Sequence, residues 1–368
     1  MKALILANSD VGLYKFRREL LEKLLSNGNE VVVALPDGKF IPDIIALGCK
    51  YIDVEFDRRN TNPVKDLALL NRYRALVKQE KPDVVLTYTI KPNVYGGLAC
   101  RLTRTPCIAN VTGLGTSIEN PGLVQKIALI LYWVGLRKAK CVFFQNEPNR
   151  AFFLQRVLTQ HANTRVLPGS GVNLIEHCFE PYPWEDKGIR LLFIGRIMKD
   201  KGVEELFTAG ERVKAKHPSV RFRLIGDCDE DYDGRIQELE RAGIIESLGF
   251  QKNVHSYIKD SHCTILPSYH EGTTNALLES AACGRPVIAT RVTGCSETFD
   301  DGITGLGCEV KSVDSLEAAI EQFILMSFAE HEAMGNAGRA KMEREYDRQI
   351  VVDAYLDEIR KAIKHSNI

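Results

Sequence analysis

The sequence lacks a net charge, a long apolar segment and a leader pattern. Its 368 residues include 48 Lys and Arg and 48 Asp and Glu, a balance that argues against a nucleic-acid-binding protein with a strongly basic surface. The longest apolar run in an expected helix covers residues 127–136, whereas a membrane-spanning helix needs about 20 residues. The first residues lead directly into Ser9 and Asp10 without a signal pattern. We therefore predict a cytoplasmic protein that does not cross a bilayer.

Closely spaced cysteines and early histidines are also missing. The ten cysteines are spread from Cys49 to Cys308 without a CxxC pair, so neither a zinc ribbon nor a disulfide framework is indicated, and we interpret them as buried free thiols. All eight histidines lie at or after His161, so chemistry in the first half must proceed without imidazole. The first apolar run is not followed by GxGxxG, which argues against a dinucleotide-dependent oxidoreductase.

Short apolar runs alternate with amphipathic stretches along most of the chain, which predicts α/β structure with parallel sheets. The length fits two domains. We expect a Rossmann-like domain over residues 1–166, a Gly- and Pro-rich linker or hinge over 167–188, a second Rossmann-like domain over 189–345, and a terminal helix within 346–368 that packs on the first domain. Ligands of such sheets bind beyond the carboxyl ends of the strands, so we expect the active site in the cleft between the domains.

The even overall charge hides a difference between the halves. Residues 1–185 contain 24 Lys and Arg against 17 Asp and Glu, and residues 186–368 contain 24 against 31. The basic half suggests an anionic partner or a membrane surface. The apolar helix at 127–136, bracketed by Lys126 and Arg137, fits either a membrane surface or a buried position, and we favour the buried position.

The loop after the apolar run 190–194 carries two cations next to glycines. Arg196 and Lys201 lie in the segment GRIMKDKG, which begins at Gly195 and precedes an expected helix. A guanidinium grips two phosphate oxygens and an ammonium adds a compact charge, as a diphosphate leaving group requires. The alternative is that both are solvated loop charges.

A second loop, in the segment EGTTNALLE, carries two glutamates. Helical spacing would place Glu271 and Glu279 about 12 Å apart, too far for the carboxylate pair of a retaining glycosidase. Glu279 could accept hydrogen bonds from hydroxyl groups such as those of a ribose diol. The alternative for Glu279 alone is an exposed carboxylate on a helix surface. The backbone N–H groups of the segment between them (Gly272, Thr273, Thr274, Asn275) favour phosphate at a helix start. Together the two loops predict a sugar-nucleotide site.

These motifs resemble those of the retaining glycosyltransferases of family 4, over nearly the whole chain. The matching features are the Glu271 and Glu279 pair, the GRIMKDKG loop and the early glycine Gly12. The resemblance implies the GT-B fold, in which two Rossmann-like domains face each other across a deep cleft. It also implies that Arg196 and Lys201 bind the donor diphosphate, that Glu271 approaches the donor sugar, and that Glu279 binds the ribose.

Weaker stretches, among them YKFR, IKPNVYG, VTGLGTS, QNEPN and GVN, are similar to bacterial enzymes that add N-acetylgalactosamine α-1,3 to an undecaprenyl-diphosphate-linked sugar. Gly12 permits close approach of a phosphate or sugar to the backbone, and we expect it to contribute to donor binding. Lys15 and Arg17 on the following helix suit an acceptor diphosphate, with a solvated basic face as the alternative. Lys91 follows a strand and so falls at the same edge.

The expected reaction is a same-face transfer from a UDP-sugar to a lipid-diphosphate-linked saccharide, with Arg196, Lys201 and the segment at Gly272 stabilising the departing phosphate. We expect no metal cofactor, because the two cations supply the charge that a metal would bring. The acidic segment 227–231 is therefore interpreted as a surface loop. A sugar-nucleotide epimerase, a phosphorylase and a noncatalytic sugar-nucleotide-binding assembly protein remain alternatives. The acceptor implies peripheral contact with the inner face of the cell membrane.

Overall fold

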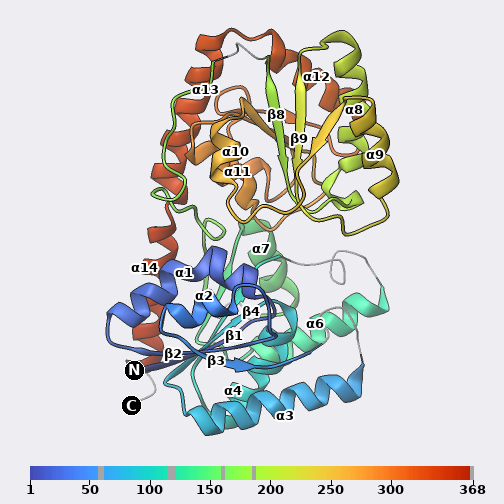
Figure 1. Ribbon diagram of the computed structural model, residues 1–368. Coiled ribbons are helices and arrows are strands. Elements are labelled where there is room, and N and C mark those ends of the chain that lie inside the picture. The colour runs from blue at the N-terminus through green and yellow to red at the C-terminus, as the bar shows by residue number, and fades with distance from the viewer. Residues whose placement is uncertain (57–61, 114–121, 159–161, 185–187, 365–368) are drawn as a thin grey trace. The chain divides into compact units, whose positions relative to one another are not determined.

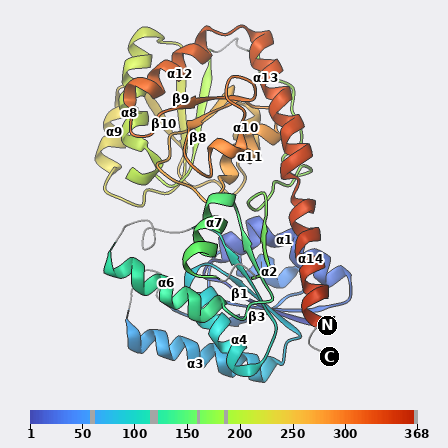
Figure 2. The ribbon, with the colours of Figure 1, turned by 180° about the vertical axis from the view of Figure 1, so that it is seen from behind.

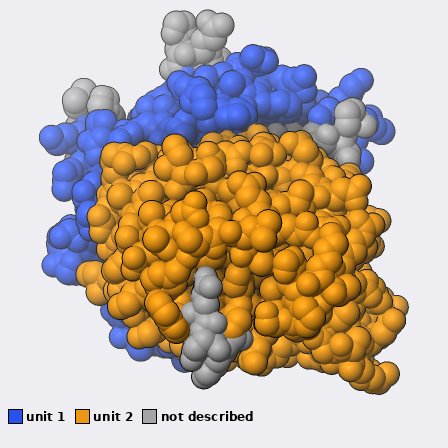
Figure 3. All heavy atoms as spheres, turned by 90° about the horizontal axis from the view of Figure 1, so that it is seen from above, with its two compact units in different colours: residues 1–170, 349–368 blue, residues 171–348 orange. Residues whose placement is uncertain are grey.

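A computed structural model describes residues 1–56, 62–113, 122–158, 162–184 and 188–364. The chain divides into two compact units, residues 1–170 with 349–368 and residues 171–348, which are coloured separately in Figure 3. Three parts of the sequence interpretation lie outside the described residues: 114–117 of the VTGLGTS motif, 185–187 of the expected linker, and 365–368 at the end of the expected terminal helix.

The first unit is built on a seven-stranded sheet with strand order β3-β2-β1-β4-β5-β6-β7, in which every pairing is parallel. The strands are β1 (Lys2–Leu6), β2 (Glu30–Leu35), β3 (Lys50–Asp53), β4 (Val84–Tyr88), β5 (Cys107–Val111), β6 (Cys141–Phe144) and β7 (Thr164–Val166). The helices are α1 (Asp10–Ser26), α2 (Ile41–Ala46), α3 (Pro63–Glu80), α4 (Gly97–Thr103), α6 (Leu123–Leu136), α7 (Glu147–Arg156) and α14 (Arg348–Lys364), with a π-helical turn at Pro92–Gly96.

Both faces of this sheet are buried, because successive residues of a strand point to opposite faces. Ala3 and Ile5 of β1 pack in one core with α1, α2 and α14, whereas Leu4 and Leu6 pack in the other with α3 and α4 (Figures 1 and 2). The last helix of the chain thus completes the core of the first unit.

The second unit holds a six-stranded parallel sheet with strand order β10-β9-β8-β11-β12-β13. The strands are β8 (Arg190–Ile194), β9 (Arg221–Ile225), β10 (Ile245–Ser247), β11 (Cys263–Leu266), β12 (Val287–Thr290) and β13 (Gly305–Cys308). The helices are α8 (Val203–Lys216), α9 (Asp233–Arg241), α10 (His255–Lys259), α11 (Asn275–Ala282), α12 (Val313–Leu325) and α13 (Phe328–Lys341), followed by a π-helical turn at Met342–Tyr346.

Helices α8, α9 and α12 contribute to the core that contains Leu191 and Phe193 of β8. Leu192, between them, packs with Ile258 of α10 and with Cys283, which follows α11. The prediction of two parallel α/β sheets is confirmed. Residues 171–184, which we expected in the linker, belong to the second unit.

The expectation of a buried helix at 127–136 is met on one face only. Tyr132 and Leu136 of α6 are buried in the first unit. The opposite face is exposed and carries the large apolar side chains of Leu123, Val124, Ile127, Ile130 and Trp133. Within the described part of the chain, no helix combines the length and the hydropathy needed to cross a membrane.

Candidate active site

The predicted donor residues of the second unit meet at one point of its sheet. β8 has β9 on one side and β11 on the other, and such a switch point of a parallel sheet opens a crevice at the carboxyl ends of the strands. The loop after β8 contains Arg196 and Lys201, and the loop after β11 contains Glu271. The two loops singled out in the sequence are therefore neighbours.

Lys201 and Glu271 are in direct contact. The Lys201 ammonium forms an ion pair with Oε1 of Glu271, and both side chains are mostly buried, at 19% and 14% exposed. The Ser268 hydroxyl donates a hydrogen bond to the same carboxylate oxygen at 2.9 Å. Because this carboxylate accepts hydrogen bonds from two donors and is only slightly exposed to solvent, its position is fixed relative to the ammonium.

The backbones of the two loops also pack closely. Gly202, at φ +69°, ends the turn Lys199–Lys201, and a Cβ atom there would lie 2.1 Å from the Pro267 carbonyl oxygen. The Tyr269 N–H donates to the Asp200 carbonyl at 2.9 Å. Only glycine permits both the left-handed backbone and this approach, so Gly202 sets how near Lys201 comes to Glu271.

Arg196 lies at the edge of this site and pairs elsewhere. Its guanidinium is 54% exposed and donates to Oδ2 of Asp229 at 2.6 Å. Asp229 belongs to the acidic segment after β9, which we interpreted as a surface loop. That segment is joined to the loop of Arg196 by a hydrogen bond from the Ile197 N–H to the Asp227 carbonyl at 2.9 Å. The acidic loop therefore orients the arginine.

Gly195 connects the loop after β8 to the end of β9. Its N–H donates to the Ile225 carbonyl at 2.9 Å. Its own carbonyl oxygen lies 1.8 Å from the position that a Cβ atom would take on Gly226. The loops after β8 and β9 thus come together at backbone distance, and a side chain on Gly226 would separate them.

The segment from Gly272 to Asn275 leads into α11 without a side-chain cap among the described residues. The Thr273 hydroxyl donates to the Gly272 carbonyl at 3.0 Å, and the Thr274 N–H donates to the Gly294 carbonyl at 3.1 Å. The buried Oδ1 atom of Asn275 accepts no hydrogen bond from any residue that the structure describes. An uncapped helix start with an unsatisfied buried acceptor beside it can receive a polar ligand.

The helix begins later than we expected. α11 starts at Asn275, so Glu271 lies in the preceding loop, and the helical estimate of about 12 Å between the two glutamates does not apply. Glu279 is half-buried in the second turn of α11. The two carboxylates are therefore placed by different elements, one by a loop and one by a helix.

Gly294 is a site residue that the sequence interpretation missed. It follows β12 at φ +86°, and a Cβ atom there would lie 2.4 Å from the Glu271 carbonyl oxygen. Its N–H donates to Oε2 of Glu297 at 2.6 Å. A third loop therefore supports the backbone of Glu271. The sequence feature that could have indicated Gly294 is a glycine four residues after an apolar run expected to form a strand.

The first unit holds Gly12, predicted to contact the donor, and the predicted acceptor residues at its own switch point, between β1 and β4. Gly12 lies in the first turn of α1, its N–H donates to the Ser9 hydroxyl at 3.2 Å, and a Cβ atom there would meet only ordinary contacts. Lys15 is half-buried on the same helix. Arg17, in contrast, is 4% exposed, and its guanidinium lies 5.3 Å from the Tyr88 ring centroid. Arg17 thus faces the core rather than the helix surface.

Lys91 follows β4 and lines a cavity of about 530 Å³. Its ammonium is 2.9 Å from Oδ1 of Asp66, and Lys65 and Arg72 line the same cavity. Thr89, two residues earlier, has φ +72°, and its buried hydroxyl has no hydrogen-bond partner within the described ranges of the chain. A β-branched residue with positive φ is strained and marks a candidate functional position, which the sequence interpretation missed.

The two α/β units and their strand-end loops are characteristic of GT-B proteins. The Anabaena protein HepE in complex with UDP has a TM-score of 0.80 with the chain, at 18% identity, over 98% of this chain and 100% of that one. A glycosyltransferase from Rickettsia africae has a TM-score of 0.79, at 18% identity, over 99% and 98%. These likenesses establish the fold.

Two family models match the chain: "Glycosyl transferase 4-like" over residues 2–146 and "Glycosyl transferases group 1" over residues 175–341. The chain therefore belongs to the group 1 glycosyltransferases, the retaining transferases of family 4. A relative from Campylobacter jejuni, N,N'-diacetylbacillosaminyl-diphospho-undecaprenol α-1,3-N-acetylgalactosaminyltransferase, is 26% identical over 99% of the chain and its own full length. An Escherichia coli UDP-Gal:α-D-GlcNAc-diphosphoundecaprenol α-1,3-galactosyltransferase is 24% identical over 71% of each chain.

Proposed function

We propose that the chain moves a hexose or N-acetylhexosamine, with N-acetylgalactosamine as the first candidate, from a UDP-sugar to an undecaprenyl-diphosphate-linked saccharide during bacterial surface-glycan assembly. The observation that carries this proposal is the mostly buried pair of Lys201 and Glu271 at the switch point of the second unit. The full-length relative that acts on a diphospho-undecaprenol acceptor supports the substrate class.

The charges of the donor site suit a departing diphosphate. Breaking the anomeric bond places negative charge on the β-phosphate, which Lys201, Arg196 and the N–H groups at the start of α11 would stabilise. Arg196 is 54% exposed and is paired with the Asp229 carboxylate, so its guanidinium is able to turn toward a phosphate. Glu271 then faces the sugar, and Glu279 accepts hydrogen bonds from the ribose hydroxyls.

Retention follows if the acceptor hydroxyl attacks the face that the phosphate leaves. In this mechanism the acceptor oxygen forms a bond to the anomeric carbon as the bond to the phosphate oxygen breaks, and that phosphate oxygen takes the acceptor proton. The positive loop lowers the free energy of this ion-pair-like transition state because its charges are already in place. A product of inverted anomeric configuration would contradict the mechanism.

The acceptor would bind to the first unit. Lys15 on α1 and Lys91 after β4 lie at its switch point, and Lys65 and Arg72 line the same cavity as Lys91. Gly12, at the start of α1, would instead contribute to donor binding. Arg17 would act indirectly, by holding α1 in place. The exposed apolar face of α6, next to Lys126, Arg137 and Lys138, suits peripheral contact with the anionic inner face of the membrane.

The test is a screen of UDP-GalNAc, UDP-GlcNAc, UDP-galactose and UDP-glucose against undecaprenyl-diphosphate-linked sugars, with products identified by mass spectrometry. We expect UDP release only when donor and lipid acceptor are both present. Turnover of the donor without an acceptor would indicate an epimerase, and a requirement for phosphate would indicate a phosphorylase. Binding of UDP with the donor left intact would indicate a noncatalytic binding protein.

A further inference from the structure

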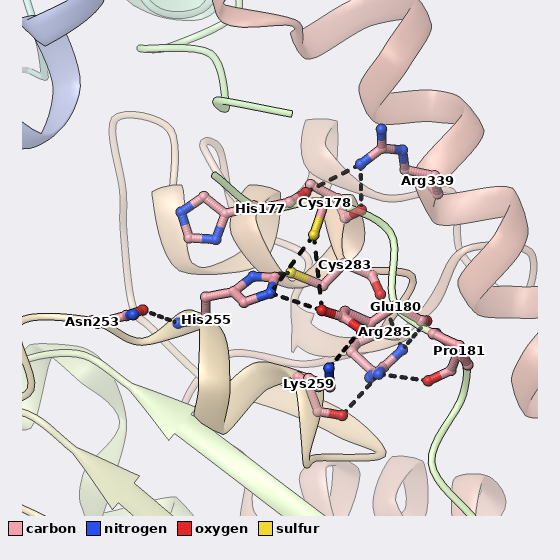
Figure 4. Close-up of polar contacts among 11 residues, drawn as sticks. His177, Cys178, Glu180, Pro181, Asn253, His255, Lys259, Cys283, Arg285 and Arg339 are labelled. Carbon is pink, nitrogen blue, oxygen red and sulfur yellow. Dashed lines mark hydrogen bonds and ion pairs between the residues drawn. The ribbon is translucent and has the colours of Figure 1, made fainter. Parts of the chain in front are cut away.

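A cluster of histidine and cysteine side chains lies in the second unit at the far end of α11 from the donor loops. It joins His177, in the segment after residue 171, with His255 at the start of α10 and Cys283 just after α11. One donor atom from each of these three residues lies within 4.8 Å of the other two. Figure 4 shows the cluster with Cys178 and Glu180 beside it. None of these side chains belongs to the proposed donor site.

The spacing of two of these atoms matches one edge of a metal tetrahedron. The Cys283 sulfur lies 3.3 Å from Nδ1 of His255. With zinc bonds of about 2.3 Å to sulfur and about 2.0–2.1 Å to nitrogen, tetrahedral geometry separates the two ligands by about 3.5 Å. A cation therefore fits between them with little movement of either side chain.

Glu180 orients the His255 ring in the way that metal sites require. Its Oε1 lies 3.1 Å from Nε2 of His255, and its Oε2 lies 3.0 Å from the Lys259 ammonium. A carboxylate that is ion-paired in this way accepts a hydrogen bond from Nε2–H, which leaves the Nδ1 lone pair facing the Cys283 sulfur. A carboxylate behind a metal-bound imidazole is a common outer-shell arrangement.

The backbone that carries the ligands is tightly held. Arg285 is fully buried, and its guanidinium donates to the carbonyls of Glu180 and Cys283 at 2.9 and 3.0 Å. Arg339 donates to the carbonyls of His177 and Ala282 at 3.1 and 2.8 Å. These bonds tie the segment at 177–180 to the end of α11, so the ligands are positioned before any ion arrives.

We propose that His177, His255 and Cys283 bind a zinc-type divalent cation, with the fourth position open to water. Two imidazoles and a thiolate are ligands that Zn²⁺ favours over Mg²⁺ or Ca²⁺. On binding, the cation takes the sulfur lone pair and the thiol proton passes to solvent. His177 and Cys283 are buried, so the cluster suits a small ion rather than a nucleophile that must reach a large substrate. Such an ion would fasten the segment after residue 171 to α10 and α11.

Cobalt titration of the metal-free, full-length chain tests this site. We expect one equivalent of Co²⁺ to bind with a thiolate-to-cobalt charge-transfer band, and Zn²⁺ to remove that band and raise the melting temperature. Cys283→Ser should abolish the band, and His177→Asn should weaken Co²⁺ binding at least ten-fold. Cys228→Ser, in a half-buried cysteine outside the cluster, is the matched control and should bind as the wild type does.

A second set of donors in the same place, Cys178, Glu180 and His255, is the alternative ligand set that the experiment must exclude. If Cys178→Ser removes the band while His177→Asn binds Co²⁺ normally, the proposed ligand set is wrong. Absence of the band in the wild-type chain also overturns the proposal. Should Cys283→Ser fail to fold, His177→Asn still decides the question, because its unchanged affinity would exclude the site.

Discussion

Replacement of Lys201 by methionine tests the donor site most directly. Methionine keeps the length of the side chain and removes its charge, so the change isolates the ammonium from the packing of the loop. Lys199, in the same short turn, provides a matched control. Its side chain is 60% exposed and lies 3.5 Å from Glu204, so Lys199→Met removes an equal charge that has no predicted contact with the donor.

The expected loss has two parts. Removal of one preorganised donor that stabilises transition-state charge costs about 2.7–4 kcal/mol, or roughly 10²- to 10³-fold in rate. The change also leaves the mostly buried Glu271 carboxylate without its cation, next to the proposed diphosphate site. We therefore expect kcat/KM of Lys201→Met to fall by at least the first amount. The folded state should lose about 1–2 kcal/mol, between the values for exposed and buried pairs.

The assay is release of UDP in the presence of the lipid acceptor, with urea unfolding measured on the same samples. Lys199→Met should stay within about three-fold of the wild-type rate, because an exposed ion pair contributes little. UDP binding by calorimetry should weaken in Lys201→Met alone. Equal losses in the two variants, or a nearly normal rate in Lys201→Met, would refute the assignment of Lys201 to the diphosphate.

Three further predictions test other parts of the structure. Arg17→Ala should lower the melting temperature, because the Arg17 guanidinium packs in the core. Lys15→Ala should lower the rate of sugar transfer and leave the melting temperature nearly unchanged. The reverse pattern would contradict these placements. Gly294→Ala should reduce donor binding, because a Cβ atom there meets the backbone of Glu271. The control Gly243→Ala, at φ +68° in open space, should cost only about 1 kcal/mol of stability. Equal donor binding in the two variants would refute the role of Gly294. Burial lowers the pKa of His262 to about 3, so between pH 7 and 5.5 the unfolded chain takes up a proton that the folded chain does not. The free energy of unfolding should therefore fall by about 1 kcal/mol over this range. The same fall in urea unfolding of His262→Leu would exclude this cause.

The sequence was sufficient to predict the α/β architecture and that the loops of Lys201 and Glu271 are neighbours. Apolar runs of four to six residues alternating with amphipathic stretches indicate a parallel sheet covered on both faces. In such a sheet, residues that directly follow the strands collect at one edge. Lys201 and Glu271 each lie in a loop that follows a strand, so the topology brings their two loops to the same edge.

Side-chain direction was less predictable, because one helix pattern fits several orientations. The basic residues near the start of α1 suggested a single polar face, yet Arg17 points into the core while Lys15 does not. α6 is apolar on nearly every side, so periodicity gave no sign that Ile127 and Ile130 remain exposed. Such choices depend on which elements pack against the helix, and those elements are distant in sequence.

The core around Arg17 illustrates this dependence. Tyr355, from the last helix of the chain, lies 5.9 Å from the guanidinium of Arg17 and accepts a hydrogen bond from the Asn110 side chain at 2.5 Å. These partners are separated by 245 or more residues, with the whole second unit between them. A local pattern carries no information about such a contact, although it decides whether a basic residue faces ligand or core. The metal ligands proposed above are likewise brought together only by the fold, because 78 residues separate His177 from His255.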